Sequence, residues 1–342
     1  MLLSFVHALK ELLPLEDAMT FGLALFVLSW VRPRRTVWLP PVGHRRTTLV
    51  WAGTAGSLLV VAVATWVSAH GVSAFAGSGF DGWWRRPAPL VAATLVVAAA
   101  GLALRRAPLP ALGERVISPR RAWHTFASRA LLWVSGITAT ALAVTALWQI
   151  AIATSAPQDG PFLGTVPKYT TLPIYMSFNS AYGYVAGAGW PNHLPTLIAI
   201  AIAIAVFFVV LRADVDRPLF ARSSAPSVRV ERESTARMFG LILLAGLITT
   251  LGAVWMHTGH AGTSAIGLDV QWGAENHPDR ILIGGSYSAI ARPMNLTGYL
   301  LQGAGVAFAL RIAVDTMRAA ARTRRTTPNV PQAQERTAGL SR

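Results

Sequence analysis

The chain of 342 residues contains no cysteine, which excludes disulfide scaffolds, thiolate metal sites and thiol-based catalysis. Charged residues are also scarce: they make up 13% of the chain, whereas soluble domains average about 25%. Apolar residues make up 53% of the chain, and the mean hydropathy is +0.45. This composition argues against a soluble globular enzyme and against a disordered chain.

Lysine is nearly absent. Lys10 and Lys168 are the only two, and the rest of the 30 basic residues are arginine. This bias, together with many alanines and valines, is typical of a protein from a GC-rich bacterial genome. Neither lysine falls in a long apolar segment, so a retinal Schiff base on a helix is excluded.

Long apolar segments dominate the chain. A membrane helix needs about 20 mostly apolar residues, and residues 14–317 contain about seven such stretches. The segment Ala199–Ala205 alternates Ala and Ile like a strand, but its long apolar surroundings favour a helix. The sequence therefore predicts an all-α integral membrane protein, a bundle with transmembrane helices at about 14–31, 48–69, 88–104, 130–153, 194–211, 238–257 and 294–314.

The two ends of the chain differ from this bundle. In residues 1–13 apolar side chains recur at helical spacing opposite polar ones, which predicts an amphipathic helix lying at the membrane interface. Residues 318–342 are rich in Arg, Thr, Gln and Pro, and we expect a disordered basic tail on the cytoplasmic side.

The basic residues also set the orientation. Twenty-four of the 30 fall in the connections 32–47, 105–129 and 212–237 and in the tail from 311. Cytoplasmic connections carry an excess of Arg and Lys, so we expect N-out and C-in in a bacterial plasma (inner) membrane. Topology explains these arginines without a nucleic-acid partner, and none is expected. The partner that this pattern does imply is the lipid bilayer.

Two long connections fall on the expected outer side, at 154–193 and 258–293. Structureless loops longer than about 15 residues are uncommon, so we expect a small extracytoplasmic cap made from them. Within the second loop, Arg280–Ile290 holds Gly284-Gly285 between two β-prone runs, which predicts a hairpin.

Histidine is the residue type on that side that could bind a metal ion or a haem. His257 and His260 are spaced i, i+3, so one helix face can present both. A metal site holding Cu or Zn could draw on the outer histidines, because imidazole suits both metals. The candidate ligands are His70, His193, His257, His260 and His277. His70 and His257 could alternatively hold haem b between two helices.

Other catalytic and transport signatures are missing. There is no HExxH zinc motif, no P-loop and no GxGxxG fingerprint. Gly284-Gly285-Ser286 misses the last glycine of a nucleophile elbow, so no catalytic residue is assigned. The predicted helices carry no ionisable residue at their centres, which disfavours a proton- or sodium-coupled carrier.

The sequence therefore favours a non-enzymatic membrane protein acting through its extracytoplasmic face. It would be an accessory subunit of a membrane or envelope complex, or a transporter component, with a membrane-protein partner or as a homo-oligomer. The alternative is a metal- or haem-binding membrane protein or metalloenzyme that uses the outer histidines.

Overall fold

The fold is taken from a computed structural model. It describes residues 17–31, 36–40, 43–69, 85–107, 115–116, 123–158, 162–163, 171–178, 181–185, 187–220, 225–262, 266–267, 280–281 and 285–326. The predicted interfacial helix at 1–13 lies outside this part of the chain.

Six helical rods are long and apolar enough to cross a membrane, which confirms the predicted helical membrane bundle. The first is continuous but has three parts, because α3 and α4 are joined by the π-helical turn η1. The rods are α3 (His44–Trp51) with η1 (Ala52–Gly56) and α4 (Ser57–Ala69), α5 (Ala88–Arg105), α6 (Arg129–Ala151), α7 (Gly189–Val215), α8 (Ala225–Gly262) and α9 (Ser288–Thr326).

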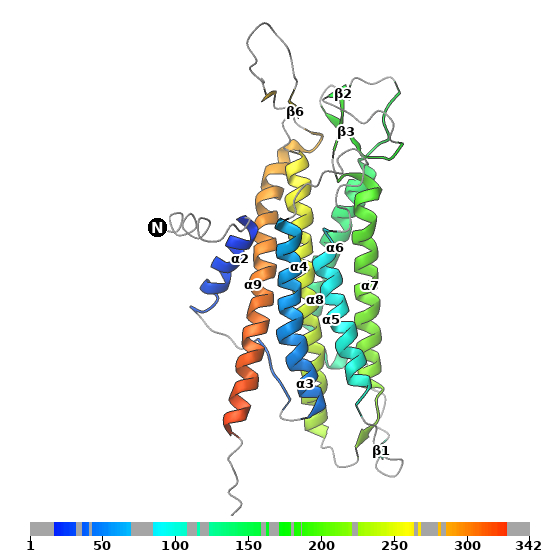
Figure 1. Ribbon diagram of the computed structural model, residues 1–342. Coiled ribbons are helices and arrows are strands. Elements are labelled where there is room, and N and C mark those ends of the chain that lie inside the picture. The colour runs from blue at the N-terminus through cyan, green and yellow to red at the C-terminus, as the bar shows by residue number, and fades with distance from the viewer. Residues whose placement is uncertain are drawn as a thin grey trace, which may run out of the picture.

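Helix α2 (Asp17–Leu28) is the described part of the segment predicted to cross at 14–31. Its 12 residues give a length of about 18 Å, less than the roughly 30 Å of a bilayer core. Figure 1 shows it on the flank of α9, where Gly22 approaches the backbone of Gly303. The seventh crossing, and the N-out orientation that depends on it, stay predictions.

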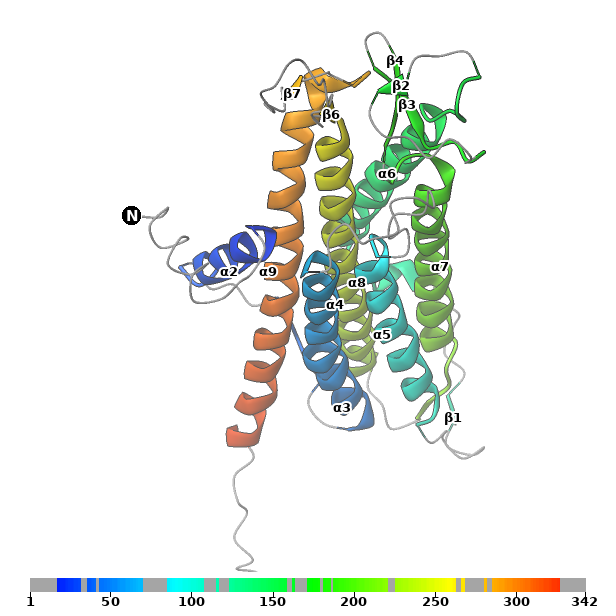
Figure 2. The same cartoon turned by 45° about the horizontal axis from the view of Figure 1, so that its top comes forward.

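Helix α8 forms the centre of the bundle, with the other long helices around it (Figures 1 and 2). In its most apolar stretch 89% of the residues are buried, against 22% in α6. The outer helices expose large apolar side chains such as Ile137, Leu95 and Ile202. Exposed apolar faces on long helices are stable against lipid tails and not against water.

The seam between α8 and α9 is built on small residues. A β-carbon added at Gly252 would collide with the backbone of Gln302, and one at Gly298 with the backbone of Met256. Close backbone approach through glycine is typical of helix pairs in membranes. Gly252 and Gly298 therefore serve packing inside the bundle.

Three small sheets lie at the two ends of the helices. At one end β2 (Phe162–Leu163) pairs in parallel with β4 (Ala181–Tyr184), which pairs antiparallel with β3 (Tyr175–Phe178). At the same end β6 (Ile266–Gly267) pairs with β7 (Arg280–Ile281). We call this the outer end, following the predicted orientation. At the inner end β1 (Arg115–Val116) pairs with β5 (Leu219–Phe220).

The hairpin predicted at Arg280–Ile290 is wrong. Ile281 pairs with Ile266 on β6, and the residues expected as the second strand begin α9 at Ser288. The amide of Ser288 donates to the carbonyl of Gly285, so the chain turns into a helix at once. The β-prone side chains of Tyr287 and Ile290 gave a local strand signal that the long apolar helix after them overrides.

Helix α9 also continues to Thr326, past position 318 where the disordered tail was expected to begin. Residues Met317–Ala321 are mainly strong helix formers, so they extend the membrane helix beyond its apolar part. Residues 327–342 lie outside the described part of the chain.

Candidate functional site

A buried arginine organises the outer end of the bundle. Arg86 precedes α5 and is only 7% exposed. Its Nη1 donates to the carbonyl of Gly187 at 3.0 Å, and its Nη2 lies 2.7 Å from Nε2 of His257. Because guanidinium can only donate, the imidazole of His257 accepts this bond and its Nε2 lone pair is in use.

Gly187 makes this contact possible. Its φ of +84° lies in the left-handed region, which favours glycine. A β-carbon at this position would collide with Nη2 of Arg86 and with Nε2 of His257. The turn before α7 therefore places a carbonyl directly against the buried guanidinium.

Beside this contact lies a second polar group centred on Tyr287. The Tyr287 hydroxyl donates to the carbonyl of Thr258 at 2.9 Å, and its ring packs edge-on against Trp148 at 4.9 Å between centroids. Burial raises the pKa of Tyr287 to about 12, and the neighbouring Gln149 amide limits the rise. Gln149 is itself only 2% exposed.

His193, on the first turns of α7, is 1% exposed. The positive charge of Arg86 and the backbone carbonyl of Gly187 both lie near its imidazole ring. Within the described part of the chain, however, neither ring nitrogen makes a hydrogen bond of normal geometry. A buried imidazole that lacks a well-formed hydrogen bond is unusual, because native proteins satisfy nearly all buried polar groups.

The five predicted metal ligands have different fates. His70 and His277 lie outside the described residues. His257 is held by Arg86, His193 is buried at the same end, and His260 is exposed. In the described ranges no three or more His, Asp or Glu side chains form a group that could hold a metal ion. Since His70 is not described, the predicted haem pair stays a prediction.

Sequence reasoning missed Arg86 and Gly187 as parts of this end. One signal was present: Arg85 and Arg86 belong to the small minority of basic residues on the expected outer side. A basic residue placed against the positive-inside trend, directly before an apolar helix, marks a candidate buried cation.

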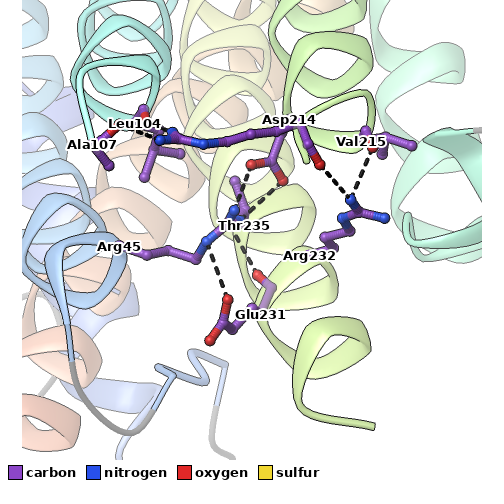
Figure 3. Close-up of polar contacts among 9 residues, drawn as sticks. Arg45, Leu104, Ala107, Asp214, Val215, Glu231, Arg232 and Thr235 are labelled. Carbon is purple, nitrogen blue, oxygen red and sulfur yellow. Dashed lines mark hydrogen bonds and ion pairs between the residues drawn. The ribbon is translucent and has the colours of Figure 1, made fainter. Parts of the chain in front are cut away.

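The inner end carries a different network, centred on an ion pair (Figure 3). Nη2 and Nη1 of Arg45 on α3 bind the two carboxylate oxygens of Asp214 on α7, at 2.7 and 3.0 Å. Nη1 also donates to the hydroxyl of Thr235 on α8 at 2.8 Å. This bidentate pair ties three helices together where they leave the apolar region.

Two further arginines close helix ends in the same network (Figure 3). Arg217 donates to the carbonyls of Leu104 and Ala107 at the end of α5. Arg232 donates to the carbonyl of Val215 at the end of α7, at 2.9 Å. The last carbonyls of a helix have no partner inside it, so these arginines complete the C-termini of α5 and α7.

Asp315 on α9 organises a third group. Its Oδ2 accepts from the hydroxyl of Thr36 at 2.6 Å and from Nε of Arg311 at 3.2 Å. Arg311 and Arg318 both stack on the ring of Trp30, at 3.7 and 3.8 Å from its centroid. Cation–π contacts of this kind fix the segment that follows α2 against α9.

These observations define a multi-pass helical membrane protein with a small β cap at one end. Comparison with protein-family models, with curated proteins and with solved structures gave no match.

Proposed function

We propose that this protein is a non-enzymatic accessory subunit of a membrane or envelope complex, and that it binds its partner through its extracytoplasmic face. The observation that carries the proposal is the way the cap is attached to the helices. A loop that serves only as a connection needs no such attachment, whereas a docking surface must keep its shape.

Backbone bonds hold the cap at two helix ends. Thr154, just after α6, forms a two-way bridge with Tyr175 on β3, at 2.9 and 3.0 Å. The amide of Ser286, just before α9, donates to the carbonyl of Ser177 at 3.2 Å. The cap is thus bonded to the ends of two helices that are far apart in sequence.

Side chains add a small apolar core beneath the cap. Met176 and Phe178 from β3 pack with Ala261 of α8, with Tyr287 and with Ala291 of α9. This core is separate from the main one inside the bundle. It supports a preorganised outer surface, which lowers the entropy cost of binding a partner.

The inner-end arginines also favour a partner at the outer end. Arg45, Arg217 and Arg232 are engaged with carbonyls, hydroxyls or carboxylates of this chain. Their contacts account for them structurally, without a partner on that side.

Site-specific photocrosslinking in cells tests the proposal. A benzoylphenylalanine residue replaces Thr171 or Gln158, which are exposed at the outer end. Matched controls carry it at Arg212 or Arg229, whose side chains are 67% and 65% exposed at the inner end. We expect one discrete adduct of defined mass from the outer positions and none from the inner ones.

Native mass spectrometry of protein extracted under mild detergent completes the test. A stoichiometric second chain, of the mass found in the outer adducts, supports the proposal. Adducts confined to the inner positions, or a lone monodisperse chain without adducts, would overturn it.

A further inference from the structure

We infer that the outer end of the bundle contains a binding site for a small oxyanion, a carboxylate or phosphate group. The site lies among α6, α7, α8 and the turn before α5. Its residues are Arg86, Gln149, His193, Thr196 and Thr258, each less than 10% exposed. This inference does not depend on the accessory-subunit proposal.

The first observation is a concentration of buried polar atoms without partners. Within the described residues, no hydrogen bond of normal geometry reaches the amide nitrogen of Gln149, either ring nitrogen of His193, or the hydroxyls of Thr196 and Thr258. A few such atoms scattered through a protein are ordinary, but each calls for an explanation. Their gathering at one end indicates a missing polar occupant.

The packing puts these atoms at one level of the bundle. Gly189, at the start of α7, lies against Ala153, just after the end of α6. One turn or so inward come Gln149 on α6 and His193 on α7. Trp255 on α8 donates to the hydroxyl of Thr145 on α6 at 2.9 Å. Thr258 and Gln149 follow these two residues by about one turn on their helices. The backbone carbonyl of Thr258 and the side-chain amide of Gln149 both lie near the Tyr287 hydroxyl.

These groups can all act as hydrogen-bond donors. An amide nitrogen, two hydroxyls and one imidazole N–H can all donate, and the guanidinium of Arg86 adds a buried positive charge. Five ion-paired carboxylates lie at the inner end, away from this site: Asp214, Asp216, Glu231, Glu233 and Asp315. Charge-assisted bonds from donors of this kind favour an oxyanion over a neutral ligand.

The start of α7 adds to this preference. Ala188, its N-cap, has no side chain that can bond the first amides, and it is buried. The positive end of a helix dipole favours an anion. The N-terminus of α7, a helix of 27 residues, directly follows the turn that contains Gly187, and His193 lies about one turn into the helix.

Thermal unfolding of the purified protein tests the inference, with tryptophan fluorescence as the signal. The probes are sodium succinate, sodium phosphate and sodium chloride at equal ionic strength, with delipidated protein in a neutral detergent. A separate arm uses dioleoylphosphatidylglycerol in mixed micelles without added phosphate. We expect succinate or phosphate, but not chloride, to raise the Tm in a saturable way. Saturation by the phosphatidylglycerol alone would assign the same oxyanion site to a lipid headgroup.

Three variants locate the site. We expect Arg86→Gln, Gln149→Leu and His193→Phe each to raise the apparent Kd by about tenfold or more, as for loss of a charged or buried hydrogen bond. Without anion, Gln149→Leu and His193→Phe should be as stable as the parent or more so, because they remove unsatisfied polar atoms. A merely structural role predicts the reverse.

The control is Thr138→Val on α6, whose hydroxyl bonds to the carbonyl of Val134 in its own helix at 2.8 Å. This variant should bind like the parent. If Arg86→Gln does not fold, the other two variants decide. No anion-specific rise in Tm in the parent, or an equal rise in all variants, would overturn the inference and leave water as the occupant.

Discussion

Single residues at the outer end show how a few polar groups are fitted into an apolar bundle. The buried guanidinium of Arg86 is accepted by an imidazole and a carbonyl, and the carbonyl is within reach only because residue 187 is glycine. Charge burial without such partners is costly. The turn before α7 therefore matters as much as the arginine itself.

Tyr287 provides a test at this scale. Replacing it with Phe removes the 2.9 Å bond to the Thr258 carbonyl and should lower the free energy of unfolding by about 1 kcal/mol. Reversible denaturation in mixed micelles measures this change. The ring contact with Trp148 is retained in Phe, so a loss of several kcal/mol would show that the hydroxyl does more than bond to Thr258.

The same residue predicts a pH dependence. The folded-state pKa of Tyr287 is about 12, above the ordinary value of about 10, so the unfolded chain releases this proton first. The stabilisation is complete below pH 10 and is lost as the pH rises toward 12. Comparing Tm at pH 9 and pH 11 for the parent and Tyr287→Phe checks this. The parent should lose more, and an equal loss would contradict the assignment.

At the scale of elements, the sequence predicts what hydropathy governs. Each of the six long helices was expected from an apolar stretch, and Ala199–Ala205 was correctly assigned to a helix despite its alternation. Whether a segment can cross a bilayer depends on its own length and composition, so it can be predicted from that segment alone. The ends of the helices are harder to predict from hydropathy. For example, α9 continues from Met317 to Thr326 because of helix propensity outside the membrane.

Contacts between distant segments were beyond reach from sequence. The pairing of β6 with β7 and the bridge of Ser177 to Ser286 join residues far apart in the chain. The partners of Arg86 come from the turn before α7 and from α8. Spacing along one segment cannot reveal such neighbours, so the histidines were noticed and the arginine between them was not.

The α8–α9 seam gives a prediction for an element. Gly252→Ala would place a β-carbon against the backbone of Gln302, so the two helices must separate locally. We expect a loss of about 1–3 kcal/mol in the free energy of unfolding, as for overpacking. Denaturation in micelles, with helicity followed by circular dichroism, measures it.

Gly136→Ala on α6 is the matched control, since a β-carbon there has nothing within 4 Å. Both changes replace helical glycine with the best helix former, so both gain the same intrinsic propensity. Gly136→Ala should therefore be neutral or slightly stabilising. Equal effects at the two positions would mean that the seam tolerates separation.

For the molecule as a whole, the charge asymmetry now has two physical roles. It predicts the orientation across the membrane, and at the inner end it also supplies the groups that close the fold. Arg45 ties α3 to α7, while Arg217 and Arg232 complete two helix C-termini. Basic residues that predict the orientation thus also cap helices within the fold.

The absence of cysteine makes the orientation directly measurable. Single replacements Thr171→Cys at the outer end and Arg229→Cys at the inner end create one reactive thiol each. A membrane-impermeant maleimide added to intact cells should label Thr171→Cys, and should label Arg229→Cys only after permeabilisation. The reverse pattern would show that the positive-inside reading of this chain is inverted.

A third replacement, Ser4→Cys, counts the crossings. If the segment 14–31 crosses the bilayer, the thiol at position 4 is labelled in intact cells together with Thr171→Cys. If α2, about 18 Å long, only enters the bilayer beside α9, the thiol is labelled with Arg229→Cys instead. Seven crossings predict the first result. The second would make this a six-helix protein whose α2 is clamped to α9 by Trp30 between Arg311 and Arg318.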